Sequence, residues 1–207
     1  MSDLTITKIA TTDNEQWPSI MAIYREAFPE WEREPENIIQ QRLRSGRYIL
    51  CYGQENNAIV GFYILEINQK PSYALLCFLA IAKNYRGLGY GTSLCQDAIT
   101  HFHNDTQLDW LLTEAEDRQA IFYGKLGFKK IDLPYNVPKF NSADTAPMHL
   151  MIICSDRNKP FIDGTCLQNL LHHTFTTGYY LEECDPRLVR QLTQVPEQAQ
   201  LLNWPPQ

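Results

Sequence analysis

A glycine-rich turn at residues 86–92 constrains this chain more than any other stretch of its sequence. It follows an apolar run at residues 75–81 and precedes a segment with helical periodicity. This strand–turn–helix order places free backbone N–H groups at a helix start, where the helix dipole also favours negative charge. Glycine admits positive φ and leaves room for a ligand, while Arg86 adds a fixed cation. The turn therefore predicts a binding site for a phosphorylated ligand.

Composition limits the classes of protein to which the chain can belong. Of its 207 residues, 44% are hydrophobic and 20% are charged, as in a soluble globular protein. The net charge of −6 argues against broad binding of nucleic acid, so an anion must be held by a local site. No apolar run is long enough to cross a membrane, and residues 1–5 lack the features of a signal peptide. We therefore expect a cytoplasmic protein.

The cysteines and histidines do not predict a metal site. Six cysteines occur without a C-x-x-C pair, and free thiols in a reducing compartment are expected. His172 and His173 are adjacent, so they would point in different directions on a helix. We expect no metal.

A change to polar composition around Ser155 marks a domain boundary. Residues 1–154 are expected to form the main domain, in which residues 132–147 form a long loop between two closing strands. Residues 155–207 form a small, mainly helical extension, with helix starts after Asp163 and Asp185. The extension is too small to fold alone, so it should dock on the main domain or on a partner subunit, which would make a homodimer.

One interpretation of the turn is a dinucleotide-binding fold. Gly87-x-Gly89 supplies the first two glycines of that fingerprint, but the third would fall at Thr92. The acidic residue expected about 20 residues further on is also missing, since Glu114 and Glu116 lie beyond that distance. This match is incomplete.

A second interpretation accounts for more of the sequence. Residues 79–91, LAIAKNYRGLGYG, resemble the pyrophosphate-binding motif of the GNAT N-acetyltransferase superfamily. Residues 120–128, AIFYGKLGF, are similar to a second element of that family, and the order of elements over residues 6–154 is similar too. The resemblance implies an α/β (α+β) fold with a mixed, mostly antiparallel sheet, splayed central strands and flanking helices. It also implies acetyl-CoA as a cosubstrate.

The same resemblance assigns residues to the cosubstrate. Backbone groups of the strand before the turn would bond the pantetheine arm, and amides of the turn would hold the pyrophosphate. The expected cofactor-binding residues are Leu79, Ala80, Ile81, Arg86, Gly87, Leu88, Gly89, Tyr90, Gly91, Thr92, Asp117 and Phe122. Asp117 stands where relatives often carry asparagine, which would weaken a hydrogen bond to the cofactor.

Direct attack of an amine on a thioester requires a base, an acid and an oxyanion donor. An alkyl amine has a pKa of about 10.4 and a thiol about 8.5, so the amine must lose a proton and the thiolate gains from an acid. Tyr123 matches the family's general acid, although its ring could instead simply pack on the cofactor. A backbone N–H near Leu79 or Ala80 would polarise the acetyl carbonyl.

The general base departs from the pattern of many relatives. Cys77 stands where they carry a glutamate on the strand before the turn, and burial would keep this thiol inert. Glu114 is our first choice because it ends the neighbouring strand among apolar residues. Glu116 is the alternative, although it could instead cap the following helix.

Two segments are candidates for the acceptor site. Glu30, Glu32 and Glu34 would attract a cationic amine, unless they form only a solvated charge run. Tyr135, Pro138 and Phe140 would form an apolar wall, unless their segment is a plain surface loop. We therefore expect an acetyl-CoA-dependent N-acetyltransferase acting on a primary amine of a small molecule. The alternatives are a protein lysine or N-terminal acetyltransferase and a non-catalytic CoA-binding module.

Overall fold

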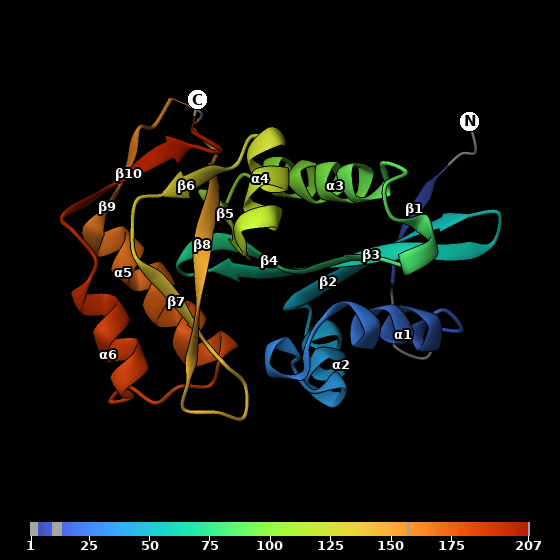
Figure 1. Ribbon diagram of the computed structural model, residues 1–207, viewed down its shortest axis with the longest axis horizontal. Helices are drawn as coiled ribbons and strands as arrows, with labels where there is room; N and C mark the ends of the chain where they lie inside the picture. Colours follow the sequence, from blue (N-terminus) through green and yellow to red (C-terminus); the bar gives the residue numbers. More distant parts are fainter. Residues whose placement is uncertain (1–3, 10–13, 157, 207) are drawn as a thin grey trace. The chain divides into compact units, whose positions relative to one another are not determined.

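The computed structural model describes residues 4–9, 14–156 and 158–206 as a mixture of strands and helices. The chain divides into two compact units: residues up to 68 together with 74–106, and residues 69–73 together with 107–207. In both units helices pack against strands whose described pairings are antiparallel (Figure 1). The expected α/β fold with a mostly antiparallel sheet is confirmed.

The first unit holds strands with helices on both of their faces. Its strands follow the order β1 (Thr5–Lys8), β2 (Tyr48–Glu55), β3 (Ala58–Gln69) and β4 (Ser72–Ile81). Helices α1 (Trp17–Ala27) and α2 (Glu36–Arg44) lie on one side of β2–β4, and α3 (Tyr90–Asn104) lies on the other (Figure 1). The short 3-10 helices η1 (Glu30–Glu32) and η2 (Lys83–Tyr85) precede α2 and α3.

The core of this unit follows from the helical periodicity of α1. Ile20 and Tyr24, one turn apart on its buried face, are each no more than 1% exposed. The ring of Tyr24 meets that of Phe78 on β4 edge-on, with centroids 5.0 Å apart. The helix ends at Ala27 because Pro29 pushes the residue before it, Phe28, into an extended conformation.

The second unit is built around one long strand. The strand β8 (Thr145–Cys154) pairs with β5 (Trp110–Ala115), β6 (Lys129–Ile131) and β7 (Tyr135–Pro138). Further strands β9 (Phe161–Asp163) and β10 (Gln198–Asn203) follow, with β10 between β6 and β9. The helical elements are α4 (Asp117–Lys125), α5 (Gly164–His173), the π-helix η3 (Thr174–Gly178) and α6 (Pro186–Thr193).

The prediction of a loop over residues 132–147 is wrong in part. That segment contains β7, and β8 begins at Thr145 rather than Met148. Tyr135 and Val137 are buried on either side of half-buried Asn136, which is the alternation of a short strand. Proline and asparagine nearby concealed this alternation, because both residues are more common in turns than in strands.

The extension contains the predicted helices and two strands that were missed. The side chain of Asp163 accepts hydrogen bonds from the backbone of Thr165 and Cys166, and that of Asp185 from Arg187, so both predicted helix starts are confirmed. Strand β10 pairs with β6 inside the second unit. The boundary at residue 155 stays a prediction. Within the described ranges, no helix is long and apolar enough to cross a membrane.

Candidate active site

The glycine turn has the backbone that the sequence predicts. Gly87 and Gly89 adopt φ of 82° and 90°, and a Cβ at either position would meet no atom within 4 Å. Glycine is therefore required for conformation and not for close packing. Gly89 is the N-cap of α3, and no side chain in the described ranges caps this helix. The first-turn amides of Gly91 and Thr92 belong to this uncapped helix start, which is where an anion can bind.

Arg86 is anchored beside this helix start. Its Nε donates to the carbonyl oxygen of Ile81, at the end of β4, over 3.0 Å. The residue is exposed, so the other guanidinium nitrogens can meet a phosphate. Leu88, at the tip of the turn, is 63% exposed. Tyr90 donates its hydroxyl to Glu55 at the end of β2. Backbone donors and a cation thus fit a CoA pyrophosphate.

The predicted pantetheine-binding strand lies tightly against β3. Leu79 and Ile81 are half-buried and Ala80 is buried. A Cβ on Gly61 would lie only 2.5 Å from the carbonyl oxygen of Ala80, so glycine is required there for close approach. This contact holds the backbone of β4 in place next to the turn.

A carboxylate lies near Cys77 although the strand itself lacks one. The Oε2 atom of Glu66, on β3, is 4.0 Å from the Cys77 Sγ, and its Oε1 accepts from Arg47. Desolvation, and then the charge of Glu66, raise the pKa of the Cys77 thiol. The thiol is therefore protonated at neutral pH, which supports the prediction that it is no nucleophile. Sequence reasoning missed Glu66 because it belongs to another strand.

The three acidic residues between α1 and α2 have different surroundings. Glu30 is exposed and Glu32 half-buried on η1, whereas Glu34 is only 3% exposed. The Glu34 carboxylate pairs with Arg42 over 3.2 Å and accepts from the Tyr48 hydroxyl over 2.9 Å. Only Glu30 and Glu32 thus present carboxylates toward solvent, and Glu34 belongs to the core.

Glu114 and Tyr135, predicted independently, are joined in the second unit. The Tyr135 hydroxyl donates to Glu114 Oε1, and the Tyr179 hydroxyl donates to Oε2 over 2.5 Å. Burial and the neighbouring Glu114 charge raise the pKa of Tyr135, so its hydroxyl keeps its proton and acts as a donor. Sequence reasoning missed Tyr179, since no local pattern connects residues that are 65 positions apart.

Helix α4 carries the remaining predicted residues. Tyr123 is 7% exposed and its ring contacts those of Phe122 and Phe128 at 5.2 and 5.3 Å. Asp117 opens the helix, is well exposed, and pairs with His149 Nε2 over 2.6 Å. Asp117 and His149 line a cavity of about 500 Å³, and Glu116 lines it too. Asp117 therefore has a protein partner beside a cavity, which the sequence did not indicate.

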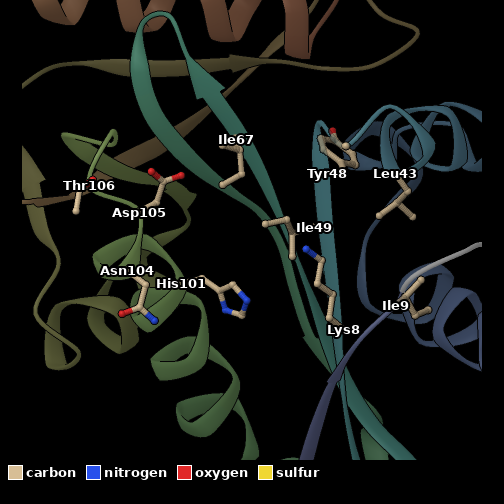
Figure 2. Close-up of a pocket in the computed structure, with 11 residues that line it drawn as sticks. Lys8, Ile9, Leu43, Tyr48, Ile49, Ile67, His101, Asn104, Asp105 and Thr106 are labelled. Atoms are coloured by element: carbon tan, nitrogen blue, oxygen red, sulfur yellow. The ribbon is translucent and has the colours of Figure 1, made fainter.

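A larger cavity in the first unit contains none of the predicted residues. Its volume is about 670 Å³, and it lies at the opposite end of α3 from the glycine turn (Figure 2). Lys8 and His101 point into it, beside Asp105 and the apolar Ile49 and Ile67. Among the described residues, no group of three or more histidine, cysteine, aspartate or glutamate side chains could hold a metal ion.

Comparison with known proteins places the chain in a family. The sequence profile of the Acetyltransferase (GNAT) family matches residues 17–128, more than half of the chain. The chain therefore belongs to the GNAT acetyltransferase family. This confirms the expected enzyme class and its acetyl-CoA cosubstrate. A search of curated protein sequences finds no match.

Solved structures share this fold at low sequence identity. A putative GNAT acetyltransferase from Bacteroides thetaiotaomicron matches with a TM-score of 0.70 at 18% identity, over 86% of this chain and 99% of the other. Spermidine N-acetyltransferase from Vibrio cholerae, in complex with CoA and spermine, matches with a TM-score of 0.60 at 17% identity. The match covers 74% of this chain and 96% of the other. The ribosomal-protein-S18-alanine N-acetyltransferase from Escherichia coli matches with a TM-score of 0.56 at 21% identity. The match covers 73% of this chain and 94% of the other.

Proposed function

We propose that this acetyltransferase transfers an acetyl group from acetyl-CoA to a primary amine of a small molecule. The open helix start behind Gly87 and Gly89 carries the proposal, because it offers amides and a cation to a diphosphate. We assign the pyrophosphate to the amides of residues 87–92 and to Arg86. The backbone of residues 79–81 would take the pantetheine arm, with Phe122 and Asp117 on α4 as further contacts.

The proposed reaction is a direct attack on the thioester. Glu114 takes a proton from the acceptor ammonium, and the freed lone pair attacks the acetyl carbon. A backbone N–H near Leu79 or Ala80 stabilises the oxyanion that forms. When the tetrahedral intermediate collapses, the C–S bond breaks and its electron pair leaves on sulfur. Tyr123 then donates a proton to the thiolate, the nitrogen of the new amide releases its extra proton to solvent, and Tyr123 regains a proton from solvent. Glu116 is the alternative base.

The acceptor is proposed to be a cation of small size. Glu30 and Glu32 attract it from η1, and Tyr135 lies beside the carboxylate that deprotonates it. Residues 135–140 and the extension supply aromatic rings next to Glu114, which favours an enclosed site over the open groove that a protein substrate needs. Among the structural neighbours, one enzyme is named for a polyamine and another for a ribosomal protein.

The test measures release of free CoA thiol across a panel of amines. We expect turnover with small alkyl amines and a loss of about 100-fold in kcat for Tyr123→Phe. Tyr180→Phe is the matched control, since Tyr180 belongs to the same unit and its side chain is 49% exposed. Binding of acetyl-CoA without thiol release for any amine would instead identify a non-catalytic CoA-binding module. Turnover confined to peptides would identify a protein acetyltransferase.

Three further predictions from the sequence are kept as proposals: a boundary at residue 155, a cytoplasmic location and a homodimer. Sedimentation of the full chain and of residues 1–154 tests the dimer. If the extension forms the interface, we expect the mass of two chains for the full chain and the mass of one chain for residues 1–154.

A further inference from the structure

Both oxygens of the Glu114 carboxylate are held by tyrosine hydroxyls from different elements. Tyr135 on β7 donates to Oε1, and Tyr179 of the C-terminal extension donates to Oε2. Hydrogen bonds donated to a carboxylate favour its ionised form and fix its orientation. The half-buried Glu114 is therefore presented as an anion in a defined direction.

Aromatic rings form a continuous wall next to this anion. Tyr135 contacts Phe175, Phe175 contacts Tyr179, and Tyr179 contacts Phe140, with ring centroids 6.0, 5.8 and 5.3 Å apart. We call these four residues the aromatic wall. Phe140 and Tyr179 are half-buried and form its accessible side, whereas Tyr135 and Phe175 are 3% and 0% exposed and support it from the core. Ring faces attract alkylammonium groups through cation–π interactions, and they also bury the alkyl chain. An anion beside an aromatic wall is the chemistry that recognises an organic cation.

The backbone of the extension places Tyr179 at this carboxylate. Helix α5 continues into η3, and the Tyr179 N–H bonds to the Thr174 carbonyl oxygen five residues earlier, over 3.3 Å. The Tyr73 hydroxyl fixes the start of η3 through His173 Nδ1 and Thr174 Oγ1, at 2.8 and 3.0 Å. Tyr179 is thus part of a supported structure and does not lie on a loose tail.

We propose that the C-terminal extension completes the acceptor site, with Tyr179 and Tyr135 positioning Glu114 and the aromatic wall selecting an alkylammonium ion. This inference rests on the proposed function and adds to it a residue and a class of substrate. Tyr179 acts through Glu114 and is a positioning residue. Tyr135 and Tyr179 are two of the groups that face the Glu114 carboxylate; Tyr73 acts electrostatically on Tyr135 and is hydrogen-bonded to His173.

The test compares Tyr179→Phe with Tyr180→Phe in the full chain. Phenylalanine keeps the ring and removes only the hydroxyl, so we expect Tyr179→Phe to raise the KM for the amine about tenfold. The acid limb of the pH profile of kcat/KM should move toward neutral pH, because the carboxylate loses a donor. The KM for acetyl-CoA should stay within about twofold of wild type, as should every parameter of Tyr180→Phe.

A double-mutant cycle separates positioning from a merely structural role. In the Glu114→Gln background, Tyr179→Phe should change the remaining rate by less than about twofold, since the two residues act as one unit. An equal loss in both backgrounds, or equal behaviour of Tyr179→Phe and Tyr180→Phe in an active enzyme, overturns the inference alone. Absence of thiol release by the wild-type chain overturns the proposed function instead.

Discussion

The backbone of Trp204 passes directly over Gly124: a Cβ at position 124 would lie 1.9 Å from the Trp204 carbonyl oxygen. Gly124 is the next-to-last residue of α4, and the close approach of the Trp204 backbone explains why no side chain stands there. The Trp204 indole also contacts the His149 ring in a tilted arrangement, with ring centroids 4.9 Å apart. Helix α4 and the last residues of the chain are therefore shaped to fit each other.

Gly124→Ala should consequently destabilise the protein by roughly 1–3 kcal/mol, because backbone atoms cannot move away as a flexible side chain could. The measurement is urea unfolding. Gly178→Ala is the control, since the added Cβ would meet only the Thr174 methyl group at 3.9 Å. Equal effects of both substitutions would show that the contact at Trp204 is unimportant.

The buried ion pair in the first unit should be sensitive to the loss of one partner. Arg42 and Glu34 are 6% and 3% exposed, and removing the cation leaves a carboxylate in the core. Arg42→Met should cost roughly 3–5 kcal/mol in the free energy of unfolding. Arg25→Met, which breaks the exposed pair with Glu36, should cost no more than about 1 kcal/mol. A small effect of Arg42→Met would contradict the burial of this pair.

Two glycines with positive φ, Gly89 in the turn and Gly46 after α2, allow a matched test of ligand binding at the turn. Gly89→Ala places a side chain at φ of 90°, which costs roughly 1–2 kcal/mol of stability. Gly46→Ala, at φ of 75° after α2, should cost about the same. Only Gly89→Ala should also weaken CoA binding, by about tenfold in calorimetry, because only Gly89 shapes the helix start. Equal CoA affinity of both variants would remove the turn from the binding site.

Two buried thiols predict a loss of stability at alkaline pH. Burial raises the pKa of Cys51 to about 11 and that of Cys95 to about 12. Above a pH of about 8.5 the unfolded chain loses these protons while the folded chain keeps them, so unfolding becomes easier as pH rises. The contribution of the two thiols to the free energy of unfolding is complete below that pH. It is lost as the pH rises toward the pKa values of the thiols in the folded chain.

We expect the free energy of unfolding to fall by up to about 1.4 kcal/mol per pH unit for each thiol between pH 9 and 11. Cys95→Ala should reduce this slope, whereas substitution of the exposed Cys184 should not. Urea titrations at pH 8, 9 and 10 measure this slope of the free energy of unfolding against pH. A slope that Cys95→Ala leaves unchanged would assign the alkaline transition to other groups.

Local signals were sufficient for the turn and for the helix starts. The conformation of Gly87 and Gly89 depends on the residues next to them in the chain, and so do the caps at Asp163 and Asp185. Strands with weak patterns were missed: β10 buries only Ala199 and Leu201, while its other residues, Leu202 included, are exposed. Its pairing with β6 supplies the hydrogen bonds that its composition does not suggest.

Charge and chemistry in the sequence indicate candidate residues, but they do not predict what each of them contacts. Glu30, Glu32 and Glu34 look alike in the sequence, yet only Glu34 meets Arg42 and Tyr48 in the core.

The sequence by itself determined the family, the enzyme class and the backbone conformation of the glycine turn, because those depend on residues close together in the chain. Only the tertiary structure decided that Tyr179 reaches Glu114 and that Glu66 lies beside Cys77. Such contacts depend on how strands and helices pack over long sequence separations, and a linear pattern of residue types does not record that packing.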